Sequence, residues 1–564
     1  MRNLFLDELE IETNGESSDD SDVSENQDPI EPSSSNTFVA KDGTVWNQLP
    51  PNFHQTPIHN IVRQRSGPLR STETMSVCDT FKCIFTDEMI DIIIRHTNKK
   101  AKHVYETYNT NNPTKTQLEW KDLTVREFNS FLGILITCGV NRSNTQFSLD
   151  MWKTNSYPLY RASMGHNRFR SILRFIRFDD ANTREERQQI DKAAPIRDLW
   201  SMLNSNLRKY YRPTENLTID EQLFPYRGRI KFKQYIPSKP AKYGIKIWWI
   251  CDAENYYPLT GQIYTGKSST GREVNQGERV VKELVAPYKG SGRNITTDNF
   301  FTTLPLAKHL LSWNLTIVGT LKKNKSYIPQ EMAPSNSRQV FSTVYGFQNN
   351  VTICSYVPKK KKAVILLSTM HHTIATSGEK EKPEIVYFYN KTKSGVDVMD
   401  HLLGQYSTQR KTNRWPLALF YNIVDIAALA AYLVYTANNY MIKKRSNARS
   451  IFLRQLGEEL SLPMIQDRSQ NIQVMRHFSS RTGIECMLQK SIVIADETAV
   501  ASTSRVAEKD KTGRKKVVGS CYICYNKQIR KRRKTRKNCA ECCKPICNEH
   551  CKMISKCNIC YEKE

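Results

Sequence analysis

Apolar residues recur every three or four positions along several segments between about residues 80 and 215. The segments are 85–97, 123–140, 166–180 and 196–211. This spacing places the apolar side chains on one face of a helix. In the first two segments a threonine precedes an acidic residue near the start, a combination typical of helix N-termini. The sequence therefore predicts a mainly helical region.

From residue 217 the pattern changes to short runs of β-branched and aromatic residues separated by Gly, Pro or Asn. In chain order these runs predict strands at 217–223, 244–252, 259–266 and 293–298, a helix at 300–313 and a strand at 315–321. Three strands that can form a meander, followed by a strand, helix, strand unit, are the elements of a ribonuclease-H-like α/β core.

Further strand-like runs and a charged loop occupy residues 325–383 and predict a β-rich insertion. A helix is expected to begin near Gly395, and a longer helix to cover 416–440. The apolar run within the longer helix contains Asn422 and Asp425 and is too short and too polar for a bilayer span, so we interpret it as buried. Loss of periodicity from about 481 to 518 predicts a linker.

Charge is distributed unevenly along the chain. The net charge is +27, but the first 36 residues hold eleven acids and one base, so the remainder carries +37. The polar, acidic segment through about residue 70 predicts disorder, and acids at the N-terminus argue against a secretory signal. A basic body favours a polyanionic partner, because lysine and arginine displace counterions from phosphates. A soluble basic protein without such a partner is the alternative.

Three separated aspartates suit the chemistry of phosphodiester cleavage, in which two divalent cations stabilise the attacking and leaving oxygens. Asp220 lies within a predicted strand, Asp298 ends another strand, and Asp397 opens a predicted helix. The corresponding elements of a ribonuclease-H-like core converge, and Asp400 shares a helix face with Asp397. Carboxylates are ligands that Mg²⁺ prefers. The ordinary alternative is that these acids cap helices or lie at the surface.

Several long runs in this order resemble the piggyBac family of transposases over about residues 80–440. They are LTIDEQL, YIPSKPAKYGIK, RNITTDNFFTTLPLAKHLL, LTIVGTLKKNK, YFYNKTKSGVDVMD and QRKTNRWPLAL. The resemblance implies that Asp220, Asp298 and Asp397 form a catalytic triad holding two Mg²⁺ or Mn²⁺ ions, with Asp400 as a nearby acid linked to activity. It also implies excision of transposon ends through hairpins and integration at TTAA sites. A domesticated descendant that binds DNA without cutting is the rival hypothesis.

Candidate DNA contacts follow the last aspartates, where positive charge lies beside an aromatic residue that can stack on an unpaired base. They are Arg410, Lys411, Asn413, Arg414 and Trp415. The family resemblance supports a base contact for Trp415, while packing of this side chain between two helices is the alternative. Asn299, next to Asp298, is another candidate. Two further groups are expected to face the same cleft as the aspartates: Arg227, Arg229, Lys231 and Lys233 follow Asp220, and Lys322, Lys323 and Lys325 follow the predicted strand at 315–321. Solvated surface lysines are the alternative there.

Four cysteine or histidine pairs in the last 44 residues have spacing suited to two tetrahedral zinc ions. The eight predicted ligands are Cys521, Cys524, Cys539, Cys542, Cys547, His550, Cys557 and Cys560. Interleaved pairs would form a cross-brace and successive pairs two fingers; the residues leave both open, and the family resemblance favours the cross-brace. The basic run 530–537 is interpreted as a nuclear import signal or a phosphate-binding patch.

Together these patterns predict a multidomain α/β protein that acts in the nucleus on double-stranded DNA, with no membrane partner. It is expected to work as a homodimer, because two transposon ends must be held together. The predicted parts are a disordered acidic region (1–70), a helical dimerisation and DNA-binding domain (71–215 and 407–480), a ribonuclease-H-like catalytic domain (216–324 and 384–406), an insertion domain (325–383), a linker (481–518) and a cysteine-rich zinc domain (519–564).

Overall fold

The computed structural model describes residues 36–51, 62, 64–266, 273–443, 445–490, 519–526, 534–535, 537 and 544–551. The chain divides into two compact units, Met1–Ile492 and Val493–Glu564, and each is described by itself.

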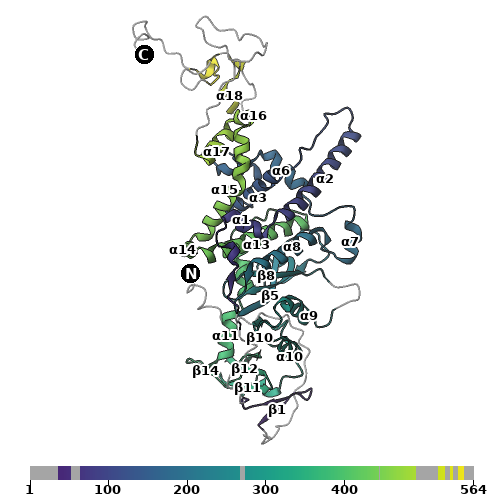
Figure 1. Cartoon of the computed structure of the whole chain (residues 1–564), viewed down its shortest axis with the longest axis vertical. Helices are drawn as coiled ribbons and strands as arrows, with labels where there is room; N and C mark the ends of the chain where they lie inside the picture. The colour runs from purple at the N-terminus through teal and green to yellow at the C-terminus, as the bar shows by residue number, and fades with distance from the viewer. Residues whose placement is uncertain are drawn as a thin grey trace, which may run out of the picture. The chain divides into compact units, whose positions relative to one another are not determined.

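Helices from both ends of the first unit's sequence pack together (Figure 1). The early helices are α1 (Val77–Ile84), α2 (Asp87–Asn111), α3 (Val125–Val140), α5 (Pro158–Ser163), α6 (His166–Phe175) and α8 (Ala194–Tyr210), and the late ones are α13 (Trp415–Asn438), α15 (Ala448–Ser469) and α17 (Phe478–Leu488). α3 lies along α15, where a Cβ added to Gly133 would come 2.6 Å from the carbonyl oxygen of Gly457. Close backbone contact therefore joins two segments that are far apart in sequence.

Helix α13 is long and apolar enough to cross a membrane, but 89% of its most apolar window is buried within the protein. It packs against α1, α8, α12 (Gly395–Gln405) and α15. The interpretation of residues 420–437 as part of a buried helix is confirmed. Helix α17 continues to Leu488, so the first residues of the predicted linker 481–518 are helical.

One mixed sheet runs through the first unit, with strand order β1-β2-β11-β12-β13-β10-β9-β5-β7-β6 and β8 paired to β7. Its central strands are β5 (Asn216–Pro225), β9 (Asn294–Thr297) and β10 (Thr316–Thr320), which are parallel to one another. β7 (Tyr243–Asp252) lies antiparallel between β5 and β8 (Pro258–Ile263), so the predicted meander is confirmed. The two-residue strand β6 (Gln234–Tyr235) pairs with β7.

The strands predicted as an insertion continue this same sheet. β13 (Lys362–Ser368) pairs with β10, and β12 (Val351–Lys359) and β11 (Thr343–Gln348) follow outward. The predicted order of elements also lacked one helix, α9 (Gln276–Val285), which lies between β8 and β9 in sequence and packs on β7 and β8. The helix predicted at 300–313 is α10 (Leu304–Ser312).

A hairpin near the N-terminus contradicts the prediction of disorder for residues 36–51. β1 (Thr37–Val39) pairs with β2 (Val45–Asn47), and β2 pairs with β11. Trp46 is fully buried, and its indole Nε1 donates to the carbonyl oxygen of Tyr327 at 2.9 Å. A single buried tryptophan in a polar segment creates no periodic pattern, which is why the sequence did not reveal the hairpin. Residues 1–35 lie outside the described residues.

The second unit contains short elements around four cysteine and histidine side chains. They are β16 (Gly519–Ser520), α18 (Tyr522–Asn526), β17 (Lys534–Thr535) and the 3-10 turn η5 (Asn548–His550), with β16 antiparallel to β17.

Candidate active site and metal centre

Sheet register brings the first two predicted aspartates together. β5 and β9 are parallel, and their last aligned pair is Ile219 with Thr297. Asp220 follows Ile219, and Asp298 follows Thr297. Neighbouring strands lie about 4.8 Å apart, so Asp220 within β5 and Asp298 just after the end of β9 lie side by side.

The third aspartate is brought to the same place by the close contact of α12 with β5. Thr218 and Asp220 point to one face of β5, because alternate strand residues share a face. A Cβ added to Gly395, the first residue of α12, would lie 2.9 Å from Thr218 Oγ1. The same hydroxyl donates to the carbonyl oxygen of Thr392 at 2.5 Å. The absence of a side chain at Gly395 therefore lets Asp397 approach Asp220.

Asp400 lies one helical turn further along and is fixed by a buried glutamine. Gln222, on the same strand face as Asp220, donates from Nε2 to Asp400 Oδ1 at 2.7 Å. Its amide oxygen accepts from Trp249 Nε1 at 2.9 Å. Burial raises the pKa of Asp400, although the bond from Gln222 opposes that rise. The carboxylate is therefore anchored to the protein beside the triad.

Burial and repulsion between neighbouring acids set the electrostatics of this cluster. The pKa of Asp220 is raised by burial and by the charges of Glu221, Asp298 and Asp397. Burial and the neighbouring Glu221 raise the pKa of Asp298 to about 6. Two lysines provide partial compensation: Lys239 Nζ lies 3.1 Å from Asp397 Oδ1, and Lys246 Nζ lies 3.7 Å from Glu221 Oε2.

Crowded hard oxygen donors with insufficient positive charge fit divalent cations such as Mg²⁺ or Mn²⁺. Among the described residues, these carboxylates are less tightly gathered than the cysteine and histidine group of the second unit, whose ligand atoms all lie within 4.8 Å of one another. A site for two cations has donors spread around both ions, so the looser arrangement is compatible with the predicted pair.

Four residues of this site were absent from the candidates read from sequence: Glu221, Gln222, Lys239 and Lys246. Gln222 had a detectable signal, because a residue two positions after Asp220 on a predicted strand shares its face. Lys239 lies within the run YIPSKPAKYGIK, but only the folded chain shows which acid it meets.

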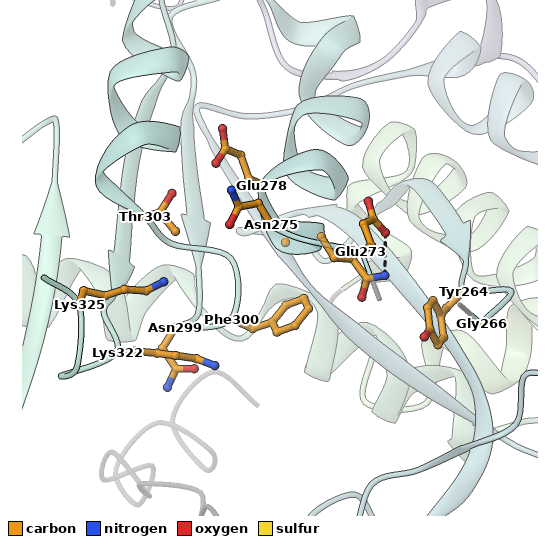
Figure 2. A pocket seen from close by; sticks show the side chains of 12 residues that line it. Tyr264, Gly266, Glu273, Asn275, Glu278, Asn299, Phe300, Thr303, Lys322 and Lys325 are labelled. Atoms are coloured by element: carbon orange, nitrogen blue, oxygen red, sulfur yellow. Dashed lines mark hydrogen bonds between the residues drawn. The ribbon is translucent and has the colours of Figure 1, made fainter. Parts of the chain in front are cut away.

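A pocket of about 370 Å³ adjoins Asp298 and contains three of the predicted DNA contacts, Asn299, Lys322 and Lys325. Figure 2 shows their side chains beside Phe300, with Asn275 and Glu278 contributed from the start of α9. Lys323 is exposed between the two pocket lysines. Two lysines and an amide around an exposed aromatic ring form a surface suited to a nucleotide.

The segments after β5 and before α13 lie against each other. Tyr226 donates from its hydroxyl to the carbonyl oxygen of Asn413 at 2.8 Å, and the rings of Phe232 and Trp415 meet edge to face at 5.5 Å. The Trp415 side chain is partly exposed. Around these contacts the predicted basic side chains are exposed, namely Arg227, Arg229, Lys231, Lys233 and Lys411, as is Asn413. The two predicted DNA-binding groups thus lie on segments that contact each other.

Two arginines of the predicted DNA contacts instead bind main-chain carbonyls of the protein. Arg410 donates to the carbonyl oxygens of Ser143 at 3.2 Å and Gln146 at 2.7 Å. Arg414 donates to three carbonyls at the end of α6, those of Leu173, Arg174 and Ile176. Burial, together with nearby Arg177, lowers the pKa of Arg414 to about 10. In this structure both arginines hold the segment before α13 in place, and their contact with DNA stays a prediction.

Four of the predicted zinc ligands, Cys521, Cys524, Cys547 and His550, converge in the second unit. Cys524 Sγ lies 3.8 Å from Cys547 Sγ, and His550 Nδ1 lies 3.3 Å from Cys547 Sγ. Tetrahedral zinc separates two sulfurs by about 3.8 Å and a sulfur from a nitrogen by about 3.5 Å, from bond lengths of about 2.3 and 2.0 Å. The donor set therefore fits zinc.

This group unites the first and third ligand pairs of the sequence, which is the interleaved arrangement. The remaining predicted ligands, Cys539, Cys542, Cys557 and Cys560, lie outside the described residues.

Known proteins resemble this chain in sequence. A family model described as Transposase IS4 matches residues 77–432. The human PiggyBac transposable element-derived protein 3 is 24% identical over 367 residues, 60% of this chain and 58% of that protein, so this chain spans less than two thirds of that relative's length. The human PiggyBac transposable element-derived protein 5 is 21% identical over 465 residues, 77% of this chain and 82% of that protein.

A solved structure, described as the cryo-EM structure of the piggyBac transposase synaptic complex with hairpin DNA, has 34% sequence identity to this chain and a TM-score of 0.71. The match covers 88% of this chain and 100% of the solved one. With the mixed sheet, its surrounding helices and the cysteine and histidine cluster, it confirms the predicted fold class.

Proposed function

Because the chain belongs to the Transposase IS4 family, in its piggyBac branch, we propose that it is an active cut-and-paste transposase that excises transposon ends through hairpins and integrates them at TTAA sites. The carrying observation is the convergence of Asp220, Asp298 and Asp397 from β5, the end of β9 and the start of α12. Burial and neighbouring acids raise the pKa values of Asp220 and Asp298, and perturbed carboxylates of this kind are typical of catalytic sites.

Asp220, Asp298 and Asp397 would hold the divalent cations, which when bound lower the pKa of a nucleophilic oxygen and stabilise a leaving one. The chain itself would orient the DNA. Exposed basic residues after β5 and before α13 would bind phosphates, and Trp415 would stack on an unpaired base. Asn299, Lys322 and Lys325 would contact DNA beside Asp298 from the adjoining pocket.

The proposal extends to the assembly and to the second unit. Cleavage of two ends in one event requires two active sites, which supports a homodimer on double-stranded DNA; the solved relative is described as a synaptic complex. Two zinc ions would hold the C-terminal module, the first through Cys521, Cys524, Cys547 and His550. The basic run 530–537 supports action in the nucleus, where the substrate DNA lies.

The test is an excision assay in cells that carry matched transposon ends, comparing the wild type, Asp298→Asn and Asp122→Asn. Asp122 is an exposed acid paired with Lys102, so its variant controls for the loss of one carboxylate. We expect excision by the wild type and by Asp122→Asn, and a loss of at least about 100-fold for Asp298→Asn, because one metal ligand is removed.

The second candidate function is DNA binding without cutting, which the transposable element-derived human relatives favour. A wild type that binds the ends but excises nothing would establish it. Excision by Asp298→Asn at the wild-type level would refute the assignment of the metal site.

A further inference from the structure

Lys239 enters the aspartate cluster from outside the three elements that carry the acids. It lies in the turn between β6 and β7, which is closed by a bond from the Ile236 amide to the Lys242 carbonyl oxygen at 2.9 Å. Only 20% of its side chain is exposed. The ammonium donates to Asp397 Oδ1 at 3.1 Å and to the carbonyl oxygen of Glu221 at 3.2 Å. A hydrogen-bonded turn therefore places a partly buried cation against the helix-borne aspartate.

The charges around this ammonium are almost all negative. Burial alone would lower the pKa of Lys239, yet the pKa is raised because Asp220, Asp397 and Glu221 lie around the amine. The second lysine of the cluster differs in its partner, since Lys246 pairs with Glu221 and not with Asp397. Lys239 is thus the lysine that contacts the Asp397 carboxylate directly, while Lys393 interacts with it at longer range.

A divalent cation and an ammonium cannot occupy the same side of one carboxylate oxygen. A metal ion that binds Asp397 Oδ1 where Lys239 now lies would break the contact with Lys239, and the energy of that contact would be subtracted from the metal affinity. The released ammonium stays at the end of a largely covered side chain, of which 20% is exposed, and is stabilised by a new anion. The anion that a transposase brings to this place is a DNA phosphate.

We propose that Lys239 is a built-in counter-ion of the aspartate site: it holds Asp397 until divalent metal displaces it, and then binds a phosphate of the DNA. The proposal rests on the proposed function, because it assumes a metal site at the three aspartates. It makes metal binding weak in the free protein and couples tight metal binding to the arrival of DNA, since each removes the other's competitor.

The first measurement is Mn²⁺ affinity without DNA, from electron paramagnetic resonance of the free ion, for the wild type, Lys239→Met and Lys246→Met. Both variants remove one positive charge near the acids, but only Lys239→Met removes the contact with Asp397. We expect Lys239→Met to bind Mn²⁺ roughly 5- to 10-fold more tightly than the wild type, from a partly buried ion pair worth about 1 kcal/mol. Lys246→Met should show a clearly smaller gain.

Equal gains in the two variants would mean that general charge removal is the cause and would overturn displacement, as would an unchanged affinity in Lys239→Met. If Lys239→Met fails to fold, as judged by its melting transition, Lys239→Gln replaces it. A wild type that binds no Mn²⁺ at the aspartates would instead refute the metal site itself. Binding at the aspartates is recognised by the loss of Mn²⁺ binding in Asp298→Asn.

The second measurement is the affinity for a duplex carrying the transposon end, in EDTA and in Ca²⁺, which takes the same oxygen ligands. We expect Lys239→Met to match the wild type in EDTA, where Lys239 is held by Asp397, and to bind several-fold more weakly in Ca²⁺, where it contacts phosphate. Equal ratios in the two conditions would refute the transfer of Lys239 from Asp397 to DNA.

Discussion

Replacing Gly395 by alanine tests whether close contact between α12 and β5 sets the active site. The added Cβ would lie 2.9 Å from Thr218 Oγ1 and 3.0 Å from Thr218 Cβ. Ordinary contacts of this kind begin near 3.4 Å, so the start of α12 must move by about 0.5 Å. Thr218 is itself buried and bonded to the Thr392 carbonyl, so it has little freedom to give way.

Overpacking of this kind costs about 1 to 3 kcal/mol, and a displacement approaching 1 Å at reacting groups can cost up to roughly 100-fold in rate. We therefore expect Gly395→Ala to lower the urea midpoint of the first unit and to reduce excision about tenfold or more. Tryptophan fluorescence reports the midpoint, and the cell excision assay reports activity.

Gly404, in the last turns of the same helix, provides a matched control. A Cβ added there meets nothing within 4 Å, so Gly404→Ala gains helix propensity of about 0.5 to 1 kcal/mol and leaves Asp397 in place. The two alanine variants should thus shift stability in opposite directions. If Gly395→Ala retains wild-type stability and excision, the close contact does not position Asp397 and the reasoning fails.

Two further predictions concern charge and zinc. Burial raises the pKa of Asp425 to about 7 and that of Asp298 to about 6. A carboxyl group whose pKa is raised in the folded protein stabilises the fold at low pH. The metal-free protein should therefore lose a few kcal/mol of unfolding free energy as pH rises from about 4 to about 7. Asp425→Asn should flatten that fall in urea melts at fixed pH values, and an unchanged slope would contradict the assignment. Zinc analysis of the full chain should give about two ions per chain. The zinc content should fall by about one ion in Cys524→Ser but not in Cys486→Ser, which alters an exposed cysteine outside the cluster. Equal zinc content in the two variants would contradict the first zinc site.

The sequence was informative wherever a pattern repeated. Runs of β-branched and aromatic residues predicted β5 and β7, and helical spacing predicted α3 and α13. Cysteine spacing predicted a zinc module, and its first group has the expected four donors. Periodicity fails where one residue does the packing, as with Trp46 in the N-terminal hairpin.

The functional site was only partly predictable for a different reason. Three aspartates could be chosen from strand and helix ends together with family resemblance. Lys239 and Gln222 act through partners far away in sequence, Asp397 and Asp400, which only the folded chain reveals. Arg414 shows the reverse case, in which the sequence predicted a function that the structure does not show. A charge beside an aromatic residue predicted a DNA contact, whereas the buried Arg414 side chain donates to carbonyls at the end of α6.

The discontinuous origin of the aspartate site also determines when it can form during synthesis. Gln222 and its partner Asp400 are separated by 178 positions, and the strands β11, β12 and β13 must be translated between them. A chain still on the ribosome can pair β5 with β9 but lacks Asp397 until α12 has emerged and docked on β5. Nascent chains, and products of premature termination before α12, therefore lack the complete aspartate cluster, because Asp397 is residue 397 of 564.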